Sequence, residues 1–100
     1  QHLLAECATD VETTRFHCYN AARRREAGLP FAKGGAMTKL VASRVAESVA
    51  SRCVDVYGGI GVTKECLAEK YLRDAKVAQI YEGTTFMQLN TIAKIVLSES

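Results

Sequence analysis

Helix-favouring residues fill most of the chain of 100 residues, and glycine or proline is expected to end the helices at three places. Gly28 and Pro30 form the first interruption, because glycine adopts the backbone angles that end a helix and proline cannot continue one. The run Gly58-Gly59-Ile60-Gly61 forms the second, and Gly83 forms the third. Between these breaks apolar residues recur at helical spacing, and no useful stretch alternates with period two. The sequence therefore predicts an all-α chain.

Four helices are expected. Three are long, over residues 1–26, 32–57 and 85–98, and residues 66–77 are expected to form a short helix followed by an irregular turn that includes Arg73 and Asp74. Thr85 and Gln88 have the spacing of a capping box at the start of the last helix. The apolar stripe of the second helix is Met37, Leu40, Val41, Val45, Val49, Cys53 and Val56. Three long helices and a short one make an incomplete up-down helical bundle, in which one seam is expected to be uncovered.

Charge and cysteine content exclude several classes of protein. There are 13 lysines and arginines against 11 acidic residues, a net charge of +2, which is too balanced to indicate a nucleic-acid partner. The longest stretch without a formal charge has 11 residues, 83–93, whereas a membrane span needs about 20 apolar residues. The four cysteines form no CxxC and neither histidine completes a zinc spacing, so no metal site is expected. We expect reduced thiols and an intracellular compartment.

Three features have a structural and a functional interpretation. Gly58-Gly59-Ile60-Gly61 is either a helix stop or a loop that lets a flat or phosphorylated ligand approach the backbone. Glu82 is either a surface acid before a helix or a base whose pKa burial raises. The run Arg23-Arg24-Arg25 offsets the negative end of a helix or binds an acidic partner. Spacing alone favours the structural interpretation of each.

Several motifs in order resemble the C-terminal helical domain of the acyl-CoA dehydrogenases. They are Pro30-Phe31-Ala32-Lys33, Ala36-Met37-Thr38-Lys39-Leu40, Gly58-Gly59-Ile60-Gly61, Glu69 to Lys76 (EKYLRDAK), and Ile80-Tyr81-Glu82-Gly83-Thr84. The tail Gln88-Leu89-Asn90-Thr91-Ile92-Ala93-Lys94 looks most like the short/branched-chain member. The resemblance covers nearly all of residues 1–100 as one domain. It implies that the first helix of that domain and the upstream domains are absent.

The resemblance implies a flavoenzyme that removes hydrogens from the α and β carbons of a short or branched-chain acyl-CoA. Glu82 falls on the position of the family's catalytic base. Its backbone N–H falls on the position of a group that donates a hydrogen bond to the thioester oxygen. Gly83 falls on a substrate contact. Contacts to FAD would come from Thr84, Thr85 and Phe86, and from a segment that reaches the FAD of a neighbouring subunit: Asp55, Val56, Tyr57, Gly58 and Gly59. Asp55 stands where the family often has Gln, and its carboxylate would repel a pyrophosphate but accept a hydrogen bond from adenine or ribose.

The partners implied by the resemblance are an acyl-CoA substrate, an electron-transferring flavoprotein as acceptor, and further copies in a homotetramer. The implied location is the mitochondrial matrix, or the cytoplasm in a bacterium. Two alternatives stay open: a helical oligomerisation module without catalysis, and an acyl-CoA oxidase that uses oxygen. We expect the 100-residue chain alone to be inactive and to bind FAD weakly or not at all.

Overall fold

The computed structural model describes residues 1–65, 67–77, 80 and 84–99, and in this part of the chain it contains helices and no strand. The α-helices are α1 (His2–Glu26), α2 (Ala32–Tyr57), α3 (Leu67–Val77) and α4 (Thr85–Glu99). A short 3-10 helix, η1 (Gly58–Val62), follows α2 directly. The all-α prediction is confirmed, and the bounds of α2 agree with those expected from Pro30 and Gly58.

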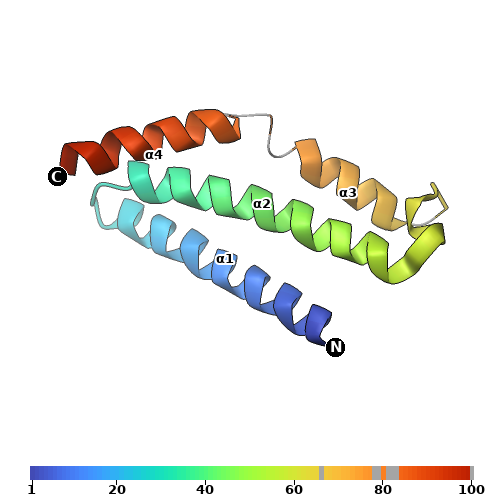
Figure 1. Ribbon diagram of the computed structural model, residues 1–100. Helices are drawn as coiled ribbons and strands as arrows, with labels where there is room; N and C mark the ends of the chain where they lie inside the picture. Colours follow the sequence, from blue (N-terminus) through green and yellow to red (C-terminus); the bar gives the residue numbers. More distant parts are fainter. Residues whose placement is uncertain (66, 78–79, 81–83, 100) are drawn as a thin grey trace.

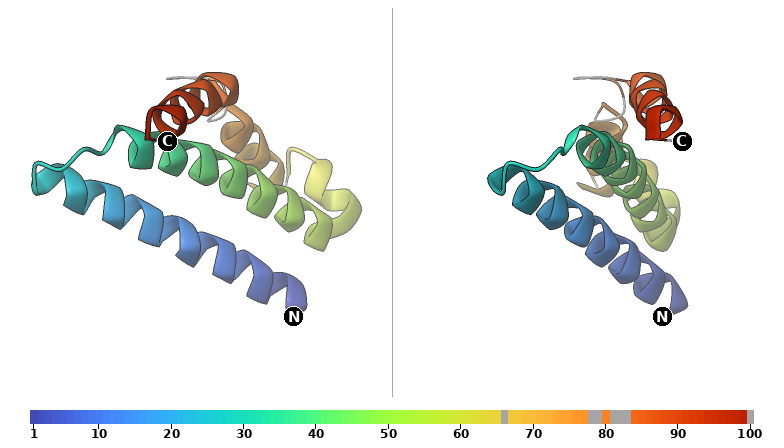
Figure 2. Two further views of the ribbon diagram at one scale, coloured as in Figure 1. Left: turned by 60° about the vertical axis from the view of Figure 1, so that its left-hand side comes forward. Right: turned by 90° about the vertical axis from the view of Figure 1, so that its left-hand side faces the viewer.

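Helix α2 is the axis of the molecule. α1 packs along one side of α2, while α3 and α4 pack on another side, α3 beside its C-terminal half and α4 beside its N-terminal half (Figure 1). The views in Figure 2 separate α1 from α4, and no contact joins these two helices in the described residues. The molecule is therefore elongated, 48 × 25 × 23 Å, with a radius of gyration of 15.8 Å. A compact chain of this length would have a radius of gyration of about 13 Å.

The turn between α1 and α2 is a Schellman motif. Gly28 has φ of 73°, the N–H of Leu29 donates to the carbonyl of Arg24, and the N–H of Gly28 donates to the carbonyl of Arg25. The Arg24 side chain also donates to the carbonyl of Pro30 at 3.0 Å. The arginines at the end of α1 thus have structural partners, which supports the helix-end interpretation of this basic run.

The buried core is small and lies on α2, η1 and α3. Its members are Ala36, Leu40, Ser43, Val54, Gly61 and Ala68, and neither α1 nor α4 has a buried residue. The predicted stripe of α2 is therefore only partly correct: Leu40 is buried, but Cys53 and Val56 are exposed and Val54 is buried instead. Several stripe residues line an open apolar groove of about 390 Å³ instead of the core, with α1 and α3 as its walls. This groove is the uncovered seam of the incomplete bundle.

Helix α3 extends through the segment for which an irregular turn is expected, so that expectation is wrong. Arg73 and Asp74 are both helical and do not pair with each other. Arg73 pairs with Glu69 at 3.2 Å and Asp74 with Lys70 at 2.9 Å, each one helical turn back. The hydrogen bond that Lys70 Nζ donates to Asp74, followed by the negative charge of Asp74, raises the pKa of Lys70. Ion pairs at this spacing stabilise a helix, which explains why α3 continues to Val77.

Gly61 provides a test of how closely η1 packs on α2. A Cβ added at Gly61 would lie 2.5 Å from the carbonyl oxygen of Val54 and 3.2 Å from Cβ of Tyr57. Gly61→Ala is expected to lower the free energy of unfolding by about 1–3 kcal/mol, because the backbone must shift to admit the methyl group. Gly59→Ala is the matched control, since a Cβ there meets nothing within 4 Å. Urea denaturation measures both, and an equal effect of the two substitutions would contradict this packing.

Candidate functional site

The C-terminal end of α2 presents the first of the two predicted cofactor-contacting segments. Val56 and Tyr57 are 65% and 56% exposed, and Asp55, Gly58 and Gly59 are also exposed. Gly58 has φ of 69°, a value that confirms the helix stop and favours glycine. Nothing lies within 4 Å of a Cβ built on Gly58 or Gly59, so their backbone is open to a ligand.

The start of α4 presents the second predicted segment, and its cap differs from the prediction. Thr84 is the N-cap residue: its Oγ1 accepts a hydrogen bond from the N–H of Met87 at 3.2 Å, and its carbonyl accepts one from Gln88. The capping box predicted from Thr85 and Gln88 is therefore not the observed cap: Thr84 is the N-cap, and Met87 stands where a capping box needs Glu or Gln. Both threonines are competent caps, and only the path of the chain into the helix selects between them.

Thr85 and Phe86 occupy the first turn of α4. Their backbone N–H groups are among those that a helix leaves without an intrahelical partner, so they are available to an acceptor on a ligand. Oγ1 of Thr85 is enclosed and has no hydrogen-bond partner, and the Phe86 ring is 72% exposed. The side chain of Thr85 is therefore closed to a ligand in this conformation, whereas the backbone of the first turn is not.

The two segments do not meet within one chain. Lys33 Nζ lies 2.8 Å from Glu99 Oε1, which places the end of α4 at the start of α2. At 1.5 Å per residue, the start of α4 then lies about 12 Å short of Asp55 along the axis of α2. Figure 1 agrees, since α4 begins beside the middle of α2. Glu82 and Gly83, the predicted base and substrate contact, lie outside the described residues.

The described residues fit the flavin cofactor that the resemblance implies, in different ways at the two segments. At the end of α2, exposed apolar side chains and open glycine backbone suit a flat aromatic group, and Asp55 forms no ion pair with a described residue that would occupy its carboxylate. At the start of α4, unpaired N–H groups suit carbonyl or phosphate oxygens. No acidic side chain occupies the first turn of α4 to oppose them.

A cavity lies elsewhere in the described part of the chain. It measures about 500 Å³, sits between the α1–α2 turn and the end of α4, and includes none of the predicted site residues. No group of acidic, histidine or cysteine residues in the described ranges is suited to hold a metal ion. Nor is any helix in the described part of the chain long and apolar enough to span a bilayer. Cys7, Cys18 and Cys53 are free thiols.

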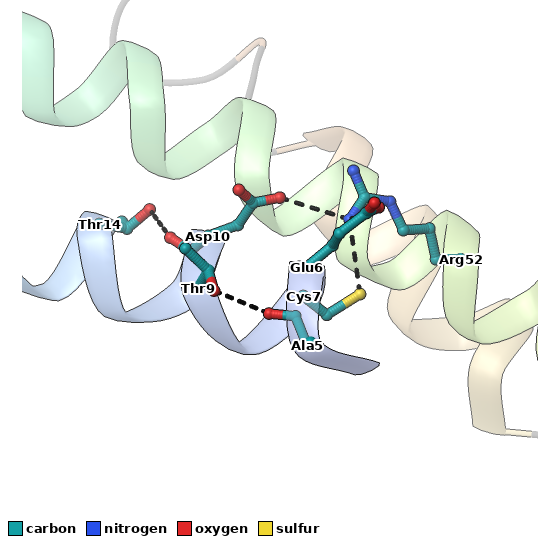
Figure 3. A network of polar contacts seen from close by, with 7 residues as sticks. All are labelled: Ala5, Glu6, Cys7, Thr9, Asp10, Thr14 and Arg52. Carbon is teal, nitrogen blue, oxygen red and sulfur yellow. Dashed lines mark hydrogen bonds and ion pairs between the residues drawn. The ribbon is translucent and has the colours of Figure 1, made fainter. Parts of the chain in front are cut away.

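Sequence reasoning missed a cluster of charged residues between α1 and α2 (Figure 3). The Arg52 guanidinium lies 3.4 Å from Asp10 Oδ2, 3.9 Å from Glu6 Oε2 and 3.7 Å from Cys7 Sγ. The hydrogen bond to Cys7, followed by attraction to Asp10 and Glu6, raises the pKa of Arg52. The available signal was the pair of acids four residues apart in the first helix, but their partner is more than 40 residues away in the sequence.

In the described residues, the fold is a helical domain whose two predicted cofactor-contacting segments are open to solvent. Residues 1–97 match the family described as "Acyl-CoA dehydrogenase, C-terminal domain". The chain belongs to the acyl-CoA dehydrogenase family, as its motifs predicted.

Two relatives and one solved structure illustrate the match. The chain is 55% identical over 97 residues to a probable short/branched chain specific acyl-CoA dehydrogenase of Dictyostelium discoideum, covering 97% of this chain and 24% of the relative. It is 50% identical over 99 residues to the mitochondrial short/branched chain specific enzyme of Rattus norvegicus, covering 99% and 23%. Butyryl-CoA dehydrogenase from Megasphaera elsdenii superimposes with a TM-score of 0.92 at 38% identity, covering 96% of this chain and 25% of that one. The chain thus spans about a quarter of the length of these proteins.

Substitutions at Thr84 test whether this residue is the N-cap of α4. Thr84→Val removes the oxygen that accepts the Met87 N–H while keeping the shape of the side chain, and it is expected to lower the free energy of unfolding by about 1 kcal/mol. Thr84→Asp retains an acceptor beside the positive end of the helix and should preserve stability. Thermal denaturation followed by circular dichroism measures both variants. A destabilising Thr85→Ala combined with a neutral Thr84→Val would place the cap at Thr85 instead.

Proposed function

We propose that this chain is the part of an acyl-CoA dehydrogenase that supplies the catalytic base and two separate FAD contacts, for the α,β-dehydrogenation of a short or branched-chain acyl-CoA. The observation that carries the proposal is the run Ile80-Tyr81-Glu82-Gly83-Thr84 directly before α4, in a chain that belongs to this family. The naming of the two relatives supports the substrate class.

Glu82 removes the proton from the carbon next to the thioester. The backbone N–H of Glu82 donates to the thioester oxygen, which gains charge as the α C–H bond breaks, and Gly83 contacts the substrate beside it. The chemistry that FAD supplies when bound is acceptance of the hydride from the β carbon. The electron pair of the α C–H bond becomes the second bond between the α and β carbons. The products are the protonated Glu82 carboxyl group, the reduced cofactor and the 2-enoyl-CoA, so atoms and electrons balance.

Position decides whether Glu82 can act. A base must lie within hydrogen-bond reach of the proton it removes, and the α and β C–H bonds must be held between the carboxylate and the cofactor. Glu82 directly precedes the first turn of α4, and the free N–H groups of Thr85 and Phe86 in that turn can hold the cofactor. The same short stretch of chain thus aims the base and anchors the group that accepts the hydride.

The separation of the two predicted segments favours a multi-subunit enzyme. One flavin contacts Thr84, Thr85 and Phe86, and Asp55 to Gly59 reaches the flavin of a neighbouring subunit. A homotetramer provides such a neighbour. The electron acceptor is an electron-transferring flavoprotein, and the location is the mitochondrial matrix, or the cytoplasm in a bacterium.

Glu82→Gln tests the proposal in an intact acyl-CoA dehydrogenase that carries this chain as its C-terminal portion. We expect turnover of short and branched acyl-CoA thioesters to fall by about 10²- to 10⁴-fold, because the amide cannot accept the proton. FAD content and acyl-CoA affinity should be retained. Glu65→Gln, at an exposed position before α3, is the matched control and should leave turnover unchanged. Full turnover in Glu82→Gln would favour a helical oligomerisation module without catalysis. Turnover of the wild-type protein with oxygen but not with an electron-transferring flavoprotein would favour an acyl-CoA oxidase.

The isolated 100-residue chain tests whether FAD binding and activity require other chain segments and subunits. Each predicted flavin-contacting segment is exposed and the two lie far apart, so neither encloses a cofactor by itself. We expect the purified chain to bind FAD weakly or not at all and to show no activity. The absorbance of the purified chain at the flavin bands after gel filtration measures how much FAD stays bound. Stoichiometric flavin in the purified chain would contradict the expectation.

A further inference from the structure

Helix α1 packs along α2, and polar side-chain contacts also join the two helices toward each end of α1. α1 has no buried residue and contacts no other helix in the described part of the chain. Near the turn, Thr38 Oγ1 donates to the carbonyl of His17 at 3.3 Å. At the opposite end, Arg52 reaches from α2 to Asp10 and Glu6. Arg52 therefore connects the first turns of α1 to the last turns of α2.

Arg52 contacts three side chains of α1, Glu6, Cys7 and Asp10. Glu6 and Asp10 are four residues apart on one face of α1, where two carboxylates repel each other. The guanidinium offsets this repulsion and also donates to the Cys7 sulfur, and its side chain is 29% exposed. Figure 3 shows these three side chains of α1 gathered around Arg52. A planar guanidinium with several donors can serve them together, which a point charge does less well.

Arg52 also lies one turn before the predicted flavin-contacting segment. Asp55 and Val56 follow it by three and four residues and so share its face of α2. An arginine and an aspartate at this spacing can form an ion pair, yet Arg52 pairs with α1 and none joins it to Asp55. The acids of α1 thus compete with Asp55 for the guanidinium, and in this structure they hold it.

We propose that Arg52 is a positioning residue for the cofactor site: Glu6 and Asp10 hold its guanidinium on α1, which fixes the last turns of α2 and leaves the Asp55 carboxylate free to accept a hydrogen bond from the adenine or ribose of FAD. This inference rests on the proposed function. It assigns Arg52 no contact with substrate or cofactor. Asp55 is acidic and would repel a phosphate, so a free carboxylate there selects for the nucleoside part of the cofactor.

The test uses an intact acyl-CoA dehydrogenase that carries this chain and measures the Kd of FAD from the quenching of flavin fluorescence. Arg52→Gln is expected to raise this Kd about tenfold, while kcat at saturating FAD changes less than about twofold. Arg52→Lys keeps the charge and should restore most of the affinity. Arg44→Gln is the matched control, because Arg44 is exposed two turns earlier on α2 and forms no ion pair with a described residue.

The double variant Glu6→Gln, Asp10→Asn removes only the α1 side of the cluster and keeps Arg52. It is also expected to raise the Kd of FAD, because the released guanidinium can pair with Asp55, and it remains informative if Arg52→Gln does not fold. A Kd within twofold of wild type in either folded variant would overturn the inference. Absence of FAD binding in the wild-type protein would overturn the proposed function as well, whereas normal FAD binding with an unaffected Arg52→Gln variant overturns only the role of Arg52.

Discussion

The burial of one face of α2 is the constraint on which the rest of the structure depends. Every other helix contacts α2, and the few buried side chains lie on α2 or on the parts of η1 and α3 that pack against it. α1 and α4 have no contact with each other in the described residues. Each packs on α2 separately; the Schellman turn and Arg52 also connect α1 to α2, and the Lys33–Glu99 pair also connects α4 to α2. A change in α2 would displace all three of its neighbours.

This arrangement explains how a small helical domain can serve a cofactor without enclosing it. The end of α2 and the start of α4 are both exposed, and they point to places about 12 Å apart along α2. One segment offers glycine backbone and apolar side chains, and the other offers helix N–H groups. Under the proposed function, each segment would supply part of a cofactor site, and other chain segments would supply the remainder. The open groove between α1 and α3 is consistent with a domain that is covered by other parts of a larger enzyme.

The sequence predicted the features that depend on local chemistry. Pro30 and Gly58 gave the bounds of α2, because a missing N–H and a positive φ act within one turn. Helix α4 begins at Thr85 as predicted, but its N-cap is Thr84 and not Thr85, since both threonines are competent caps. The turn expected at Arg73 and Asp74 was wrong because each has a partner one turn back in α3. The Arg52 cluster could not be predicted, because it depends on how α1 crosses α2. The motif containing Glu82 predicted the family, and the match over residues 1–97 confirms it.

The most direct measurement is an experimental structure of an intact acyl-CoA dehydrogenase that carries this chain, with FAD and a non-reactive acyl-CoA thioether bound. Our account predicts a Glu82 carboxylate about 3–3.5 Å from the α carbon, with the start of α4 against the same flavin and the end of α2 against the flavin of another subunit. A Glu82 side chain directed into solvent, or both segments on one flavin, would contradict it.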